Sequence, residues 1–164
     1  MDSLWVVNAS PIITLAKVGQ LQLLNSITQQ LLIPTAVAQE ILAGPADDPA
    51  VVSLNGGWGH KAAAAHIPDT LIEWGLGSGE TAVLALAMER APAVAVLDDA
   101  SARAAARTLS VPVIGTLGVV LRAKVKGLVP SASKIIRDLQ VAGLFIDQAI
   151  ARRALEQIGE SWDQ

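Results

Sequence analysis

Four short apolar runs, each closed by polar or turn-forming residues, constrain the fold of this chain more than any other feature. They are residues 4–7, 31–34, 94–97 and 111–114. Uninterrupted apolar runs of this length are typical of strands that are buried on both faces. Because segments of helical length separate the runs, we expect a short parallel sheet flanked by helices, in a three-layer α/β/α architecture.

Capping residues and helix breakers predict where the helices begin and end. Ser10 followed by Pro11 is expected to cap the first helix. The expected helices are 11–18, one starting within 21–24, 35–43, 79–90, 101–109, 117–126, 131–141 and 147–158. Glycine and proline cluster within residues 44–78, which we therefore expect to be irregular apart from a helical turn at 50–54.

The composition favours one domain, over residues 1–164, with an aliphatic core. Apolar residues make up 52% of the 164 residues, which excludes a disordered chain. There is no cysteine, so disulfides and cysteine-ligated metals are excluded, as fits a reducing compartment. The longest uncharged stretch, 18–39, is too polar to span a membrane, and the first residues lack a basic leader. We expect a cytoplasmic protein without a membrane partner.

The net charge of −3 conceals an asymmetry along the chain. Residues 90–137 contain eight basic and two acidic residues, so this segment carries a net charge of +6. One interpretation is ordinary solvated helix faces. The other is a basic surface around an acidic pair, as a phosphate-backbone substrate requires.

Polar side chains follow three of the expected strands. Asn8 and Ser10 come after the first, Asp98 and Asp99 after the strand at 94–97, and Thr116 after the strand at 111–114. The carboxyl ends of parallel strands lie at one edge of a sheet, where ligands bind in such folds. We therefore expect these three groups of side chains to lie close together.

Two further acids lie in otherwise apolar helical surroundings. Glu40 is within the helix that follows Pro34, and Glu80 is in the first turn of the helix that starts near Ser78. Carboxylate, hydroxyl and amide oxygens are hard ligands that suit Mg²⁺ or Mn²⁺. The sequence thus predicts a divalent-metal site at this edge.

Each of these residues also has a purely structural interpretation. Glu80 would complement the helix dipole, and Glu40 would face solvent. Asp99 would pair with Arg103 while Asp98 caps the next helix. Asn8 and Ser10 would form only a turn and a helix cap.

Other chemistries fit the residues less well. The segment 75–80 opens a helix with three glycines, but the dinucleotide fingerprint needs a further glycine where Glu80 stands. His60 and His66 are too few for a zinc site, and no nucleophile elbow is present. A phosphatase of similar fold needs an aspartyl nucleophile where Asn8 stands.

Several motifs in this order resemble a subgroup of the PIN-domain family, similar to the VapC-type toxins of prokaryotic toxin–antitoxin pairs. They are Val7-Asn8-Ala9-Ser10-Pro11, Ile33-Pro34 with Glu40-Ile41, Gly77-Ser78-Gly79-Glu80, Leu97-Asp98-Asp99 with Ala102-Arg103, Ile114-Gly115-Thr116-Leu117-Gly118 and Gly143-Leu144-Phe145-Ile146. The resemblance covers nearly the whole chain. It implies a PIN-like fold and a Mg²⁺- or Mn²⁺-dependent ribonuclease.

The resemblance also assigns roles to residues. It makes Glu40, Glu80, Asp98 and Asp99 the catalytic acids, with Asn8, Glu80, Asp98 and Asp99 as metal ligands and Ser10 and Thr116 in support. Asp99 is the better match to the family's last acid by its spacing to the following helix. Asn8 stands where most PIN nucleases have an aspartate, which removes one negative charge from the site and weakens metal binding.

The implied reaction is in-line attack on an RNA phosphodiester by a metal-activated water, leaving a 5′-phosphate. Arg103 and Arg107, one turn apart, are expected to contact flanking phosphates. The implied partners are an RNA substrate, a cognate antitoxin protein and a second copy of the chain, and Trp58 and Trp74 are candidates for the docking surface. The alternative is a catalytically weak or inactive PIN-like module that binds RNA or a protein.

Overall fold

The computed structural model describes residues 2–162 and contains a five-stranded parallel sheet in the order β3-β2-β1-β4-β5. The strands are β1 (Asp2–Val7), β2 (Thr28–Pro34), β3 (His60–Ala62), β4 (Val94–Val96) and β5 (Val113–Ile114). Trp5 in the central strand is in register with Leu31 on one side and Val94 on the other. The predicted parallel sheet is confirmed.

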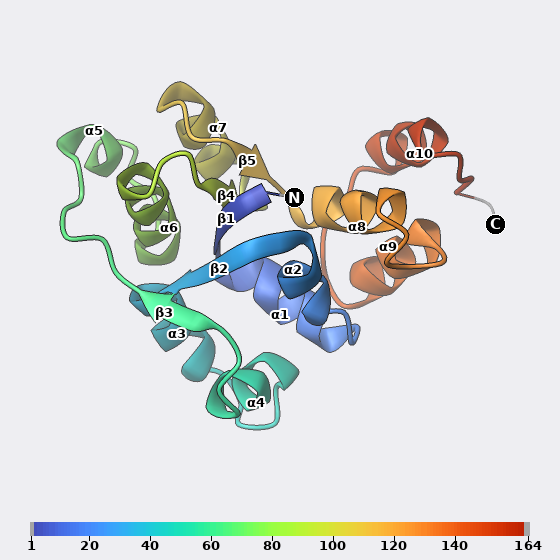
Figure 1. Cartoon of the computed structure of the whole chain (residues 1–164), viewed down its shortest axis with the longest axis horizontal. Coiled ribbons are helices and arrows are strands. Elements are labelled where there is room, and N and C mark those ends of the chain that lie inside the picture. Colours follow the sequence, from blue (N-terminus) through green and yellow to red (C-terminus); the bar gives the residue numbers. More distant parts are fainter. Residues whose placement is uncertain (1, 163–164) are drawn as a thin grey trace.

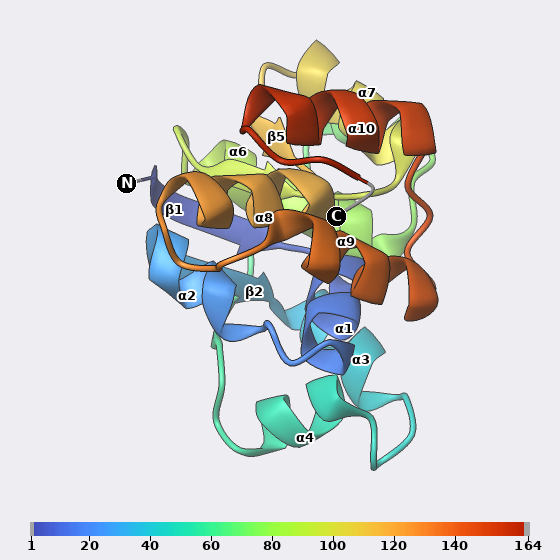
Figure 2. The same ribbon diagram turned by 90° about the vertical axis from the view of Figure 1, so that its right-hand side faces the viewer.

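Helices connect the strands and cover the sheet. They are α1 (Ala9–Lys17), α2 (Gln22–Ile27), α3 (Thr35–Leu42), α4 (Pro49–Asn55), α5 (Asp69–Ile72), α6 (Ser78–Glu89), α7 (Ala100–Thr108), α8 (Thr116–Val125), α9 (Ala132–Val141) and α10 (Gln148–Gln157). Figure 1 shows α6 on one side of the sheet and α8 with α9 on the other. Figure 2 shows α10 lying alongside α8 at the outer surface. The three-layer α/β/α architecture is confirmed.

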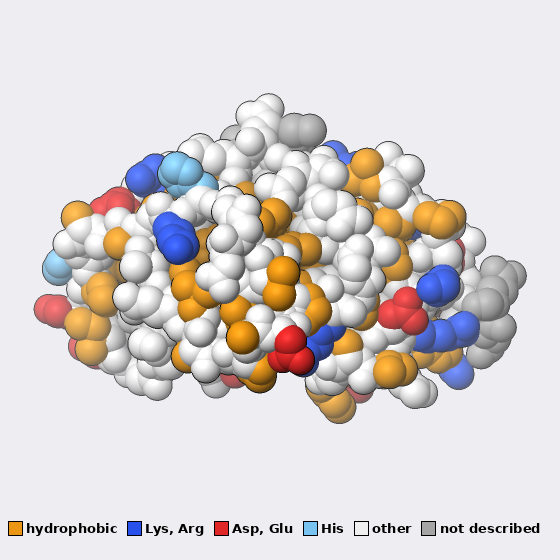
Figure 3. Space-filling view, turned by 90° about the horizontal axis from the view of Figure 1, so that it is seen from below, with side chains coloured by type: hydrophobic (Ala, Val, Ile, Leu, Met, Phe, Trp, Pro, Cys, Tyr) orange, Lys and Arg blue, Asp and Glu red, His pale blue; other side chains and the backbone are white. Residues whose placement is uncertain are grey.

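The core is aliphatic and centres on β1. Trp5, Val6 and Val7 are fully buried, since α6 packs on β1 and neighbouring strands cover both edges. Among residues 2–162, no helix combines the length and the apolar character that a membrane span needs. Figure 3 shows hydrophobic side chains exposed in several patches, with charged groups between them.

The segment 44–78 is more ordered than the sequence indicates. The predicted turn is helix α4, but the expectation of irregular chain elsewhere is wrong for β3 and α5. His60 in β3 is in register with Leu32, so this short polar strand forms by extending the edge of β2. Trp58 is half-buried and donates its Nε1 proton to Asn25 Oδ1 at 2.8 Å, whereas Trp74 is 37% exposed.

Candidate functional site

Asn8 follows the last residue of β1 and is nearly buried, with 5% of its surface exposed. Its backbone N–H donates to Val96 O at 3.1 Å, which fixes it against the end of β4. Its side-chain Oδ1 is buried and accepts no hydrogen bond from any described residue. Buried polar atoms in folded proteins are normally paired, so this acceptor is free to bind a water molecule, an ion or a ligand.

Ser10 does not cap the first helix, contrary to the sequence prediction. Helix α1 begins at Ala9 and has Asn8 at its N-cap position. The reason is that β1 continues to Val7, so the helix starts as soon as the chain leaves the sheet. Ser10 thus lies inside the first turn, and its hydroxyl is available to the site.

Glu40 and Asn8 approach one another across Gly79. A methyl group on the Gly79 Cα would lie 2.7 Å from Glu40 Oε2 and 3.2 Å from Asn8 Oδ1. Both oxygens therefore face the same point beside the first turn of α6, and only glycine leaves that point open. Glu40 is exposed, so its carboxylate end is able to move.

Asp98 lies between the ends of β4 and β5 and is held by hydroxyl and amide donors. Its Oδ1 accepts from Thr116 N at 2.8 Å, and its Oδ2 accepts from Thr116 Oγ1 at 2.6 Å and Ser10 Oγ at 3.4 Å. Thr116 is fully buried. These contacts orient one half-buried carboxylate at the predicted edge of the sheet.

Asp99 has a structural role at the start of α7. Its carboxylate caps that helix by accepting from Ala102 N at 2.9 Å, and the residue is exposed. The interpretation in which Asp98 caps this helix is therefore wrong, because the cap is the residue directly before Ala100. Within residues 2–162, no ion pair joins Asp99 to Arg103, whose Nη1 instead donates to Leu97 O at 3.2 Å. The geometry favours Asp98 over Asp99 as the acid that faces the site.

Glu80 is half-buried in the first turn of α6, but it is turned back along its own helix. A methyl group on Gly77 would lie 2.6 Å from Glu80 Oε2. The Glu80 carboxylate therefore lies beside Gly77, whereas Glu40 Oε2 and Asn8 Oδ1 lie beside Gly79. Across the described part of the chain, no three acidic or histidine side chains gather closely enough to hold a metal by themselves.

The nearest cations are Arg103 and Arg107 on α7. The pKa of Arg103 is lowered from its ordinary value, first because the guanidinium is partly desolvated and then because Arg107 repels it, while Asp98 acts in the opposite direction. Neither arginine forms an ion pair with any carboxylate in residues 2–162. Both are therefore available to an anion from outside the chain.

The side-chain oxygen atoms at this edge suit a hard divalent cation, although they do not form a complete set of ligands. A buried amide oxygen without a partner, an exposed carboxylate beside it and the space above Gly79 supply oxygen ligands and room. Mg²⁺ needs few protein ligands because it retains water molecules. Sequence reasoning did not predict that Gly79 keeps this space open, because it considered the glycines of 75–79 as a nucleotide loop and as part of the family motif but not for the room they leave.

Comparison with known families agrees with this geometry. No curated protein matches the chain. A family model described as a PIN domain matches residues 4–160, which include every strand end that contributes to the site. With a match of that extent on an all-parallel three-layer fold, the chain belongs to the PIN-domain family.

Proposed function

We propose that this protein is a Mg²⁺- or Mn²⁺-dependent ribonuclease whose centre lies at the carboxyl edge of the sheet. PIN domains have a nuclease-type fold, which supports nuclease chemistry. The observation that carries the proposal is the buried Oδ1 of Asn8, which lacks a donor and faces the same point as the Glu40 carboxylate. A cation placed there would satisfy both oxygens at once.

The residues around that point would have separate roles in binding the cation and the RNA. Asn8 and Glu40 would hold the cation from one side, and Asp98, oriented by Thr116, would bind from the other. Glu80 would join through a rotation of its side chain or through a water molecule. Arg103 and Arg107 would bind phosphates of the strand. A divalent ion in this position supplies charge neutralisation at the scissile phosphate and a more acidic water for the attack.

The roles of the two adjacent aspartates can be separated by matched variants. Asp98→Asn removes the charge of the carboxylate held by Thr116, and Asp99→Asn changes a helix cap into an almost equally good one. We expect Asp98→Asn to lose Mn²⁺-dependent RNA cleavage and Asp99→Asn to retain it, with 5′-phosphate ends on the products. Cleavage that survives in Asp98→Asn, Glu40→Gln and Glu80→Gln alike would come from a contaminating nuclease.

A second candidate function is an RNA-binding module that does not cleave. It is favoured by the neutral Asn8 and by the lack of a three-acid group within residues 2–162. Isothermal titration calorimetry with MnCl₂ distinguishes the two functions. A ribonuclease gives a saturable heat that Glu40→Gln weakens, whereas the inactive module gives none.

We further propose that this ribonuclease is the cytoplasmic toxin of a toxin–antitoxin pair. It would act as a homodimer and be held inactive by an antitoxin. Exposed apolar side chains on and after α5, Ile72 at 57% and Trp74 at 37%, offer a surface to a protein partner. Expression of the wild type should arrest growth, and Asp98→Asn should not. Growth that continues with a soluble, folded wild type would contradict the toxin role.

A further inference from the structure

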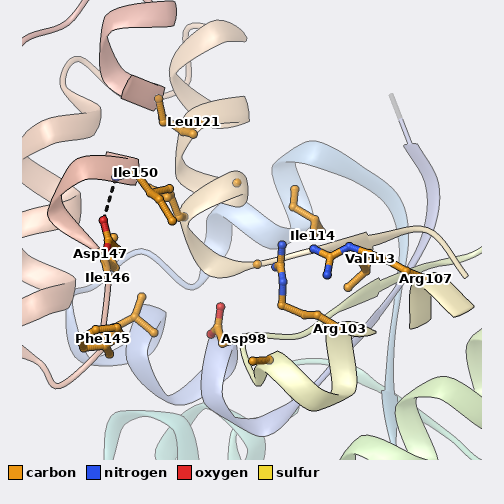
Figure 4. Close-up of a pocket in the computed structure, with 16 residues that line it drawn as sticks. Asp98, Arg103, Arg107, Val113, Ile114, Leu121, Phe145, Ile146, Asp147 and Ile150 are labelled. Carbon is orange, nitrogen blue, oxygen red and sulfur yellow. Dashed lines mark hydrogen bonds between the residues drawn. The ribbon is translucent and has the colours of Figure 1, made fainter. Parts of the chain in front are cut away.

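A pocket lies beside Asp98, outside the Asn8–Glu40 group. It has a volume of about 660 Å³ and is formed by α7, β5, α8 and the start of the C-terminal helix α10. Figure 4 shows Asp98 between two kinds of wall: the arginines of α7 on one side, and Phe145 with Ile150 on the other. Pockets that hold one small ligand have volumes of about 300–1,000 Å³, so this one has room for a nucleotide.

The basic wall has the properties of a phosphate site. Arg103 and Arg107 both line the pocket and repel one another; Asp98 attracts Arg103, but neither arginine forms an ion pair with a carboxylate within residues 2–162. An anion between them would relieve that repulsion. A phosphate fits best, since guanidinium groups bind its oxygens in pairs.

The opposite wall has the properties of a base site. Phe145 is the only phenylalanine in the chain, and 90% of its surface is exposed although it lines a pocket. Ile150, 54% exposed, and Leu121 lie on the same side of Asp98 and extend the apolar surface. An aromatic ring on such a surface is a stacking platform for an unpaired base of any identity.

Asp147 holds the Ile150 part of this wall in place. Its Oδ1 accepts from Ala149 N at 2.9 Å and from Ile150 N at 3.1 Å, which caps α10 at the rim of the pocket. Ile150 is therefore held by the hydrogen bonds of a helix start. Phe145 and Ile150 line the same pocket as the arginines.

We propose that this pocket binds one nucleotide of a single-stranded RNA, next to the phosphate at the catalytic edge. Its base packs on Phe145 and Ile150, and its phosphate lies between Arg103 and Arg107. The inference rests on the proposed function, because Asp98 belongs to both the pocket and the catalytic edge. It adds what the catalytic acids do not supply, namely a binding site for the substrate strand beside the point of cleavage.

An alternative occupant of the same apolar wall is a second copy of the chain. Such an interface would cover Phe145 and Ile150 but leave the two repelling guanidinium groups beside it without an anion from outside the chain. A nucleotide satisfies both walls together, which is why it is the favoured occupant.

The test measures RNA binding without cleavage. Fluorescence anisotropy of a short fluorescein-labelled single-stranded RNA is recorded in EDTA, with wild type, Phe145→Ala and Phe145→Trp. Val141→Ala is the matched control, because Val141 is also 90% exposed but lies outside this pocket. We expect Phe145→Ala to bind about tenfold more weakly, Phe145→Trp to retain binding, and the control to match wild type. Arg107→Ala should also lower the salt dependence of binding by about one phosphate contact.

The outcomes separate this inference from the function on which it rests. If Phe145→Ala binds RNA as tightly as wild type, the base site is wrong, even if Mn²⁺-dependent cleavage is observed. If Phe145→Ala turns a dimer into a monomer without changing RNA affinity, the wall is a subunit interface and the inference is also wrong. If Phe145→Ala loses binding while wild type never cleaves with Mn²⁺, the nucleotide site stands and the ribonuclease proposal fails.

Discussion

Replacement of Gly79 by alanine should separate the stability of the fold from the ability to bind metal. The new methyl group would lie 2.7 Å from Glu40 Oε2, 3.2 Å from Asn8 Oδ1 and 3.7 Å from Val37 Cγ2. The first distance is too short for any real contact, so one group has to move. Glu40 is the one that moves, because its carboxylate is the end of an exposed, flexible side chain.

The free energy of unfolding and the metal affinity are expected to respond differently to this substitution. Alanine is favoured over glycine inside a helix by about 0.8–1.0 kcal/mol, and Gly79 lies in the first turn of α6, where the gain is smaller. The free energy of unfolding should therefore stay equal to wild type or rise by less than about 1 kcal/mol. Metal affinity should fall by about 10- to 100-fold, as when the support of a ligand is lost, because the methyl group displaces Glu40 and fills the space beside Asn8.

Two measurements on the same protein test this reasoning. Urea denaturation in EDTA gives the free energy of unfolding, and calorimetric titration with MnCl₂ gives the affinity. Ser78→Ala is the control, since Ser78 is the exposed residue before Gly79 in the same turn. Unchanged Mn²⁺ affinity in Gly79→Ala would refute the placement of the cation between Asn8 and Glu40. A large loss of stability would refute the view that Glu40 yields to the new methyl group.

Three further substitutions test individual contacts. Asn8→Asp should bind Mn²⁺ more tightly but unfold more easily in EDTA, by about 1–3 kcal/mol, because it buries a carboxylate where no donor faces Oδ1; thermal melts with and without Mn²⁺ measure both effects. Asp147→Ala should cost about 1 kcal/mol and increase hydrogen exchange in α10, whereas Asp147→Asn preserves the cap. Glu160→Ala should cost about 2 kcal/mol in urea, because its carboxylate accepts from Ala132 N at 2.9 Å at the start of α9, and the exposed Glu156→Ala serves as control.

The sequence predicted correctly that Ser10, Asp98 and Thr116 lie together, because polar residues follow the end of each strand. Val7, Val96 and Ile114 are the last residues of β1, β4 and β5, and polar side chains follow each of them. A parallel register brings such positions together regardless of loop length. The position of the predicted edge therefore follows from the apolar runs together with the polar residues after them.

The choice between Asp98 and Asp99 could not be made in the same way. Spacing to α7 favoured Asp99, but that same spacing makes it the N-cap, since the helix begins at the next residue. The deciding contacts come from Thr116, eighteen residues further along the chain, and depend on the pairing of β4 with β5. The capping signal was present in the sequence and, given more weight, would have identified Asp99 as the N-cap of α7.

The pocket beside Asp98 was also outside the reach of sequence patterns. Arg103 and Phe145 are brought together only by the packing of α7, α8 and the C-terminal segment around β5. No periodicity relates positions that far apart. The arginines were predicted from their helical spacing, whereas the apolar wall that faces them required the structure.

The amide at position 8 links the stability of the apo protein to the strength of the proposed site. An aspartate there would add charge for a cation, but without metal it would be a buried carboxylate with no donor at the position of Oδ1. Asparagine leaves the same oxygen in place at a smaller desolvation cost. Cation binding then relies more on Glu40 and Asp98, and Glu40 is an exposed carboxylate whose position depends on Gly79. A site of this kind should bind metal weakly until a phosphate adds its own charge, so Mn²⁺ affinity should rise when RNA is bound.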